Sequence, residues 1–570
     1  MFKFFSKKKE QHRFDPDEVF IDSLNLSGMD TQQMEGVIEK PIHTTPIAVF
    51  KAVLFVVVSV FSFKLVQLQI VQGQHFSFLA EKNLLRKTPL FAERGVIRDR
   101  NGIELAWNEV RERDKKDIPT FPLRKYIEKG GFGHLLGYVR YPQKDKSGFY
   151  WAYHTLGEAG VEKKYNDILS GENGSLLFET NALGEKISEN LVKEAIPGKN
   201  IDLSIDAKVQ NILFRSLEKI VEQYHFQGGA AAIMDVQTGE LLALVTYPEF
   251  DANKMTNERN TIQSYFQDTR KPFLHRAVSG LYPPGSTVKP FIALAALHEG
   301  IITPRTTILS TGKIEIPNPY NPSKPSVYRD WKKGGHGVVD VKKALAESVN
   351  TFFYAIGGGY QNQKGLGIQK IDTYLSDFAI GKKTGFSLFP EKDGVIPSPA
   401  WKKKTFSDER WRLGDTYISS IGQFGFLVSP LEMLRSVTAI ANRGTLITPV
   451  IQKGEQGKKI PLPIPLTEEE YQVVTEGMRE VVTQGTARNI NFPYLAIAAK
   501  TGTAQVGKQN AFFDSWIIGF FPYAKPRYSF VLFLEKGEKG KGGSASLAFR
   551  DFIQTLHEEY PEFFSLYLQS

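Results

Sequence analysis

Hydrophobic residues gather into one long run near the start of the chain, from Ile47 to Val71. Its charge-free centre, Ala52 to Phe63, is short for a bilayer span, but Lys51 and Lys64 can extend their ammonium groups towards the membrane surface. A buried core helix is the alternative. Because the run precedes all domain-like sequence and no small-residue cleavage site follows it, the pattern predicts an uncleaved transmembrane anchor over 47–71.

Shorter apolar runs after the anchor predict strands. The stretch from Ala92 to Asn108 contains an Asn101-Gly102 pair between apolar pieces, which is typical of a hairpin. Residues 109–200 hold short strand-like runs among many Gly and Lys residues. The Pro-Gly pair within Ile196–Asn200 indicates a domain boundary.

From residue 201 the runs become longer and more regular. Apolar residues at helical spacing predict one helix over 207–224 and a last helix from about Ser546 to Glu558. Alternating or continuous apolar runs predict five strands. One lies before Gly239 and one after it, and the other three lie within 494–506, 514–522 and 528–536. This order indicates an α+β fold, with helices on the face of a sheet.

Composition narrows the class of protein. With 570 residues, the chain is expected to hold two to four domains, and 41% hydrophobic with 23% charged residues is typical of a globular protein. The net charge of +9 is spread along the chain, which gives little support to a nucleic-acid partner. The absence of Cys excludes disulfides, Cys-ligated zinc and thiol catalysis.

Three short motifs carry candidate chemistry. Ser286 follows a Pro-Pro-Gly break and opens an apolar run, with Lys289 three residues later on the same helix face. A serine hydroxyl needs a base to become a nucleophile, and a lysine whose pKa is lowered by burial can be that base. Free N–H groups at a helix start can also stabilise an oxyanion.

The other two motifs are Ser348-Val349-Asn350, in a stretch expected to be helical, and Lys500-Thr501-Gly502-Thr503, at the end of an apolar strand. Each pattern alone is weak, because Ser-x-x-Lys, Ser-x-Asn and Lys-Thr-Gly each occur elsewhere in the chain. Their order and their context favour these three copies, since penicillin-binding proteins and class A β-lactamases carry such motifs in this order.

The chain therefore resembles the class B penicillin-binding proteins, most closely their elongation-type branch, over roughly residues 64 to 555. The resemblance is carried by "ERGVIRDRNGIELAWN", "LYPPGSTVKP", "GGHGVVDVKKALAESVNTFFY", "PSPAWKKK", "WRLGDTYISSIGQ" and "AAKTGTAQV". It implies a penicillin-binding/serine β-lactamase-like transpeptidase domain over 201–570, with an antiparallel sheet flanked by helices. An elongated pedestal (dimerisation-type) domain over 72–200 and a cytoplasmic tail over 1–46 complete the expected organisation.

The resemblance also implies an activity, the cross-linking of peptidoglycan stem peptides through a serine acyl-enzyme that β-lactams inhibit. Ser286 would attack the D-Ala-D-Ala carbonyl, and Lys289 would accept its proton. Ser348 would relay protons to the leaving amine, Asn350 would hold the substrate amide, and Lys500 would set the positive potential of the site.

Binding of the substrate would fall to the rest of the third motif. Thr501 and Thr503 would bind the terminal carboxylate, and Gly502 would let the strand approach the substrate backbone. The backbone N–H groups of Ser286 and Thr503 would form the oxyanion hole. No cofactor is implied.

The chain departs from the family pattern in three places. Val349 stands where the family often has Cys, and some members are associated with a metal there. Asp330 and His336 are still present in this chain, but without a Cys we expect no metal. Phe424-Gly425 reverses the usual order of glycine and aromatic residue, which puts the active-site wall in question. The segment from Asn108 to Gly133 is too short and too polar to build the usual head subdomain, so activation through such a head is in doubt.

Further expectations follow from the resemblance. The implied partners are a SEDS-family glycosyltransferase and rod-complex scaffold proteins, and the implied place is the inner membrane, with the catalytic domain in the periplasm. A D-Ala-D-Ala carboxypeptidase side activity is a further expectation. The alternatives are a septal class B transpeptidase and a non-catalytic β-lactam-binding scaffold or sensor, which acylation and cross-linking assays would distinguish.

Overall fold

The computed structural model describes residues 44–77, 85–109, 121–146, 150–180, 186–318, 321 and 323–568. The chain divides into two units, Met1–Arg86 and Lys87–Ser570. The first contains α1 (Thr44–Val66), which continues into the π-helical turn η4 (Gln67–Val71). Residues Thr45–Val71 are long and apolar enough to cross a membrane, and none of the span is buried in the protein. An exposed apolar helix fits the predicted anchor and not the alternative of a core helix.

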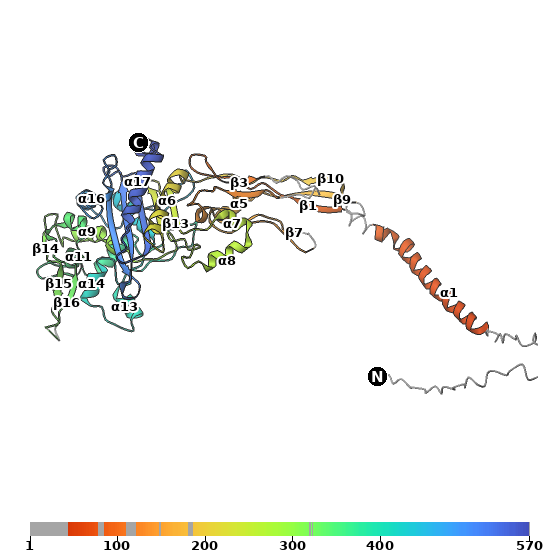
Figure 1. The fold of residues 1–570 in the computed structure, drawn as a ribbon, viewed down its shortest axis with the longest axis horizontal. Helices are drawn as coiled ribbons and strands as arrows, with labels where there is room; N and C mark the ends of the chain where they lie inside the picture. Colours follow the sequence, from red (N-terminus) through yellow and green to blue (C-terminus); the bar gives the residue numbers. More distant parts are fainter. Residues whose placement is uncertain are drawn as a thin grey trace, which may run out of the picture. The chain divides into compact units, whose positions relative to one another are not determined.

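The second unit begins with the segment predicted as a pedestal, which is built from short strands and short helices (Figure 1). Its two larger sheets have the strand orders β1-β9-β10 and β11-β2-β3-β4. The strands of these sheets are β1 (Leu85–Leu90), β2 (Ile97–Arg98), β3 (Glu104–Glu109), β4 (Leu123–Tyr126), β9 (Gly174–Thr180), β10 (Lys186–Lys193) and β11 (Ile201–Asp202). The pair β2 and β3 is the predicted hairpin.

Small elements complete the pedestal. The strands β5 (Val139–Arg140) and β6 (Gln143–Lys144) pair with β8 (Leu156–Gly157) and β7 (Tyr150–Ala152), next to α3 (Gly133–Leu136), α4 (Gly160–Lys164) and α5 (Asn166–Leu169). A buried carboxylate joins its parts: Glu162 accepts hydrogen bonds from Arg94 Nε at 2.5 Å and Arg124 Nε at 2.7 Å. All three side chains are almost inaccessible to solvent, so the pedestal depends on this charged triad for its packing.

A five-stranded antiparallel sheet forms the centre of the unit, with the order β13-β12-β22-β21-β20. Its strands are β12 (Gly228–Asp235), β13 (Leu241–Tyr247), β20 (Ala498–Val506), β21 (Phe512–Phe521) and β22 (Tyr528–Glu538). All five predicted strands are confirmed. The strand β20 lies at the edge of the sheet, so one side of it is open to other parts of the chain or to a ligand.

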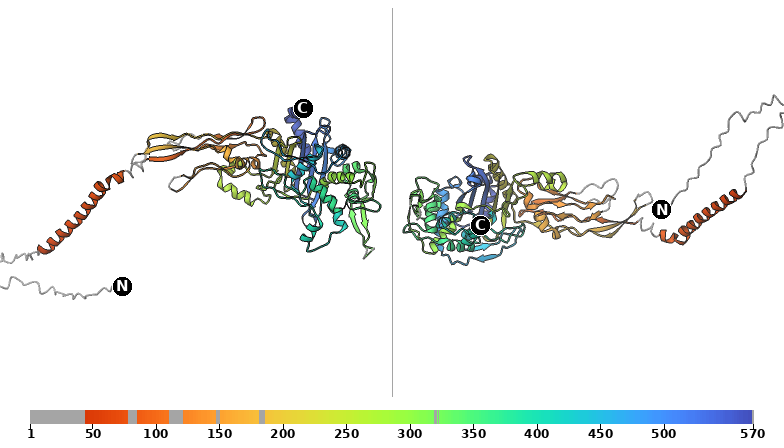
Figure 2. Two further views of the ribbon diagram at one scale, coloured as in Figure 1. Left: turned by 180° about the vertical axis from the view of Figure 1, so that it is seen from behind. Right: turned by 90° about the horizontal axis from the view of Figure 1, so that it is seen from below.

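The alternation of side chains along the strands gives the sheet two apolar faces. In β12, Ala231 and Ile233 pack with α6 (Ala207–Gln223) and α17 (Ala545–Glu559), whereas Ala230 and Ala232 belong to the larger core on the other side. On that side α15 (Pro430–Ala441) lies against β12, β21 and β22. Figure 1 shows α6 and α17 beside the sheet, and Figure 2 shows the same part of the chain from two other sides.

A helical region extends from the larger core. It contains α9 (Lys289–His298), α10 (Val341–Ala346), α11 (Asn350–Gly358), α12 (Gly367–Asp377), α13 (Pro399–Thr405), α14 (Leu413–Ser419) and α16 (Glu468–Thr483). Short hairpins at its rim pair β14 (Ile308–Ser310) with β17 (Gly337–Val339), β15 (Lys313–Ile316) with β16 (Ser326–Arg329), and β18 (Thr445–Ile447) with β19 (Lys459–Pro461). Two helices, α7 (Ala252–Asn257) and α8 (Arg259–Gln267), lie towards the pedestal.

The predicted α+β fold is confirmed, with one error at the C-terminus. The helix predicted from about Ser546 is α17, but it is not the last, because α18 (Glu562–Leu568) follows it. Apolar residues of the pedestal, among them Ile97 and Leu136, belong to the same core as residues after position 200. The predicted boundary at residue 200 therefore lies inside one compact unit and stays a prediction.

Candidate active site

The Pro-Pro-Gly break places Ser286 on a tight turn at the edge of the sheet. Residues Gly285–Val288 form one 3₁₀ turn, and α9 begins immediately after it at Lys289. Gly285 has a φ of +54°, and a Cβ at this position would lie 2.7 Å from the carbonyl oxygen of Thr503. Only glycine fits there, because both the backbone conformation and the contact exclude a side chain. The turn therefore brings Ser286, half-buried, beside the third motif.

Lys289 is completely buried below this turn. Its Nζ donates to Ser348 O at 2.8 Å, to Ser348 Oγ at 3.3 Å and to Asn350 Oδ1 at 2.7 Å. Burial lowers the pKa of Lys289 to about 7, although the charge of Asp330 works in the opposite direction. Among the described residues, the hydrogen bonds of Lys289 Nζ thus join it to the second motif and not to Ser286.

The second motif lies in a turn and not inside a helix. The helix α10 ends at Ala346 and α11 begins at Asn350, so Ser348 stands between them. Its φ of +55° is rare for a residue with a side chain and costs roughly 1–2 kcal/mol. This conformation was not expected from the sequence, which predicted a helical stretch.

The third motif occupies the edge strand β20. Lys500 is completely buried, and its Nζ donates to Ser348 Oγ at 2.9 Å and to Thr501 O at 2.9 Å. Burial, and after it the charge of Lys289, hold the pKa of Lys500 well below its usual range. Ser348 Oγ is thereby within hydrogen-bond distance of both lysines.

Gly502 lies in close contact with the turn that carries Ser286. A Cβ at this position would lie 2.8 Å from Pro284 O and 2.8 Å from Thr287 Cγ2. The glycine thus lets β20 lie against the turn that carries Ser286, whatever it does for a substrate. Next to it, Thr501 Oγ1 is 2.6 Å from Thr486 Oγ1, and Thr486 was not predicted as a site residue.

These elements enclose one cleft of about 450 Å³. Six of the eight predicted site residues line it, namely Ser286, Ser348, Asn350, Thr501, Gly502 and Thr503, while Lys289 and Lys500 lie buried beneath. The structure therefore brings all eight together. It adds residues that were not predicted as site residues: Trp331, Ile421, Gln423, Thr486, Gln505, Ser515, Trp516, Ser544 and Ser546.

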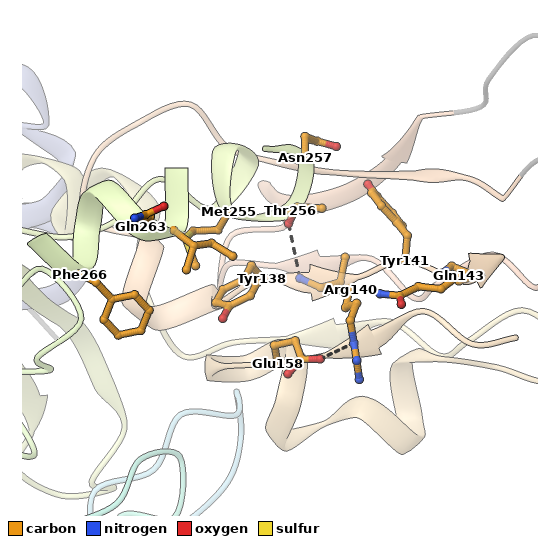
Figure 3. A pocket seen from close by; sticks show the side chains of 13 residues that line it. Tyr138, Arg140, Tyr141, Gln143, Glu158, Met255, Thr256, Asn257, Gln263 and Phe266 are labelled. Carbon is orange, nitrogen blue, oxygen red and sulfur yellow. Dashed lines mark hydrogen bonds and ion pairs between the residues drawn. The ribbon is translucent and has the colours of Figure 1, made fainter. Parts of the chain in front are cut away.

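A second hollow of about 870 Å³ lies between the pedestal strands β5 and β6 and the helices α7 and α8 (Figure 3). Aromatic side chains, Tyr138 and Phe266 among them, line it beside an ion pair between Arg140 and Glu158 at 2.8 Å. None of the predicted catalytic residues lines this hollow. The chemistry is therefore assigned to the smaller cleft.

The reversed pair Phe424-Gly425 directly follows Gln423, which lines the cleft, but neither residue of the pair lines it. Phe424 adopts a φ of +65°, and its ring contacts those of Trp401, Phe406 and Trp411. A Cβ at Gly425 would lie 2.2 Å from Trp401 Cη2. The reversal thus builds an aromatic cluster behind the cleft, with the glycine needed where the indole passes the backbone.

The residues near Val349 do not fit a metal ion. In the part of the chain that the structure describes, no group of three or more His, Cys, Asp or Glu side chains could hold one. His336 directs Nδ1 to Glu347 and Nε2 towards Asp330, so the two carboxylates lie at different edges of the ring. They do not converge on one point, and the expectation of no metal stays a prediction.

The comparison with protein families matches this architecture. Residues 229–554 match the model of the penicillin binding protein transpeptidase domain, and residues 117–203 match that of the penicillin-binding protein dimerisation domain. The chain belongs to the penicillin-binding protein transpeptidase family. One relative of this penicillin-binding protein is the peptidoglycan D,D-transpeptidase MrdA of Acinetobacter baumannii, at 30% identity over 84% of this chain and 83% of the relative.

Solved structures agree with the assignment. Penicillin-binding protein 2 of Helicobacter pylori in complex with MreC has a TM-score of 0.67 and 29% identity, covering 84% of this chain and 100% of that chain. Penicillin-binding protein 2 of Pseudomonas aeruginosa in complex with WCK 5153 has a TM-score of 0.66 and 30% identity, covering 82% of this chain and 96% of that chain. A chain of a peptidoglycan synthase complex, described as coordinating polymerization and crosslinking, has a TM-score of 0.68 and 25% identity, covering 90% of this chain and 98% of that chain. This penicillin-binding protein thus shares the fold of penicillin-binding protein 2, pedestal included.

Proposed function

We propose that this protein is a peptidoglycan D,D-transpeptidase of the elongation type, with Ser286 as its nucleophile. The observation that carries the proposal is the hydrogen-bonded chain from Lys289 through Ser348 to Lys500, beside Ser286 in one cleft. A lysine whose pKa is about 7 is neutral in half of the molecules at neutral pH, so Lys289 can accept a proton there.

The reaction then follows from the positions of these groups. Ser286 Oγ attacks the carbonyl carbon of the penultimate D-Ala of a stem peptide, and its proton passes to Lys289. The backbone N–H groups of Ser286 and Thr503 stabilise the oxyanion, which the close approach of Gly285 to Thr503 supports. The C–N bond breaks, and the departing D-Ala amine takes a proton through Ser348 from Lys289.

The second half of the reaction reverses these steps. The amine of another stem peptide attacks the acyl-enzyme and gives its proton to Lys289 through Ser348. The C–O bond to Ser286 breaks, and Ser286 Oγ takes a proton back from Lys289. Asn350 holds the donor amide, and Thr501 and Thr503 bind the terminal carboxylate of the donor. That carboxylate also favours the charged form of Lys500, which burial disfavours in the free protein.

Water in place of the acceptor amine would release a shortened peptide, which is a D-Ala-D-Ala carboxypeptidase side activity of the same site. β-Lactams, whose strained amide acylates Ser286 in the same way, inhibit the enzyme.

The protein acts beside a membrane. Residues 47–71 anchor it in the inner membrane with a cytoplasmic N-terminus, and the unit from Lys87 onward works in the periplasm. A SEDS-family glycosyltransferase and a scaffold protein of the MreC kind are its partners, which is supported by the complexes that similar proteins form.

A cross-linking assay tests the proposal. The full-length protein in detergent is incubated with uncross-linked pentapeptide strands, and the digested products are separated by mass. We expect cross-linked dimers and released D-Ala from the wild type, and neither from Ser286→Ala or Lys289→Met. D-Ala release without dimers would show a carboxypeptidase, and an unchanged substrate would show a protein without this activity.

A further inference from the structure

A loop outside the three motifs contacts the turn that carries Ser348 both before and after this residue. The loop follows β16 and contains Asp330, Trp331 and His336. Asp330 Oδ2 accepts from Thr351 N at 2.9 Å and from Thr351 Oγ1 at 3.0 Å. This carboxylate thus holds the residue three positions after Ser348, in the first turn of α11.

Glu347, the residue before Ser348, is held by two rings of the same loop. Trp331 Nε1 donates to Glu347 O at 3.1 Å. His336 Nδ1 lies 2.5 Å from Glu347 Oε2, and the His336 ring is buried. The other ring nitrogen, Nε2, lies 3.4 Å from Asp330 Oδ1 and has no hydrogen-bond partner among the described residues. His336 therefore stands between the carboxylate of Asp330, which binds Thr351, and that of Glu347, which precedes Ser348.

We infer that Asp330, Trp331 and His336 form a brace that positions Ser348 for the proposed reaction. The left-handed conformation of Ser348 is unfavourable by itself, so the neighbouring contacts must maintain it. The brace fixes residues 347 and 351, and the turn between them then holds Ser348 Oγ between Lys289 and Lys500. Asp330 has a second effect, because its charge works against the lowered pKa of Lys289.

The brace consists of side chains and needs no metal ion. A histidine between two carboxylates can interact with one of them at each ring nitrogen, and here the contact at Nδ1 is short whereas the contact at Nε2 is the longer one. In this arrangement the carboxylates face different ring nitrogens, which an ion bound by all three side chains would not allow. His336 is thus a positioning residue, since it touches neither Ser286 nor the space that a substrate would occupy.

The inference rests on the proposed function, and its test separates the two. Acylation of the full-length protein by a fluorescent penicillin is followed by stopped flow, which gives the dissociation constant of the initial complex and the rate constant of acylation. We expect His336→Ala to lower the rate constant about tenfold or more and to leave the dissociation constant within about threefold, because a displaced Ser348 impairs proton transfer and not binding.

Matched variants make the test specific. His336→Asn can place an amide N–H near the position of Nδ1, so it should recover most of the lost rate. Lys332→Ala, an exposed side chain in the same loop, should change neither constant. Glu347→Ala removes the partner of His336, and Glu347 is the more exposed of the two side chains. This variant should lower the rate constant of acylation as His336→Ala does. It therefore keeps the test decisive if His336→Ala does not fold.

Several outcomes would overturn the brace. One is an unchanged rate constant in folded His336→Ala and Glu347→Ala; another is a loss that His336→Asn does not recover. A wild-type rate that falls with a chelator and returns with zinc would show that an ion, and not the imidazole ring, joins the carboxylates. If the wild type itself is not acylated, the proposed function fails and not only the brace.

Discussion

The pH dependence of acylation follows from the buried position of Lys289. In water a lysine is almost entirely protonated at pH 8, and it could not then act as a base. Burial lowers the pKa of Lys289 to about 7, so the neutral form increases about tenfold for each pH unit below 7 and levels off above it. Between pH 5 and pH 8 the acylation rate constant should therefore rise roughly a hundredfold.

Stopped-flow acylation by a fluorescent penicillin measures this profile. The dissociation constant of the initial complex, measured at the same pH values, shows whether the change belongs to the chemical step. Asp330→Asn supplies a control with a known sign: the carboxylate favours the ammonium form of Lys289, so its removal should move the inflection to lower pH.

Two results would refute the reasoning. A flat profile between pH 5 and pH 8 would mean that the proton acceptor does not titrate there. An inflection above pH 9 would mean that Lys289 keeps the pKa of an exposed lysine, and that burial does not prepare it as a base.

Two further substitutions test other parts of the structure. Gly502→Ala puts a methyl group 2.8 Å from Pro284 O. We therefore expect about 1–3 kcal/mol of destabilisation and acylation slower by about tenfold or more. A rate of acylation equal to that of the wild type would contradict the contact between β20 and the turn that carries Ser286. Glu162→Gln leaves Arg94 and Arg124 buried without their counter-charge, so we expect about 3–5 kcal/mol less stability by denaturant unfolding. If Glu162→Gln unfolds like the wild type, the buried triad does not hold the pedestal together.

The sheet and its two main covering helices could be predicted from sequence because their signals are local. Alternating or continuous apolar runs gave β12, β13, β20, β21 and β22, and helical spacing gave α6 and α17. The short helix α18 was missed because its few residues after α17 show no separate period. The anchor was also visible, because a long apolar run needs no tertiary contact to be recognised.

The candidate site could be predicted only in part. Motif order selected the residues that line the cleft, but it did not show how they are held. The left-handed conformation of Ser348 depends on contacts with residues near 330 and 500, which lie far from it in sequence. Thr486 is another example, because only the fold brings its hydroxyl to Thr501.

Gly502 has a structural contact that the sequence did not predict. The expectation concerned a substrate backbone, whereas the structure shows a close contact with the turn that carries Ser286. Such contacts between segments more than two hundred residues apart cannot be derived from spacing or composition.

The central claim is that Ser286 is the nucleophile of a serine acyl-enzyme. The most direct measurement is acylation of the purified full-length protein by a fluorescent penicillin, followed by proteolysis and mass mapping of the labelled peptide. We expect label on the peptide that contains Ser286, and none in a folded Ser286→Ala variant. Label on another peptide, or no label on the folded wild type, would contradict it.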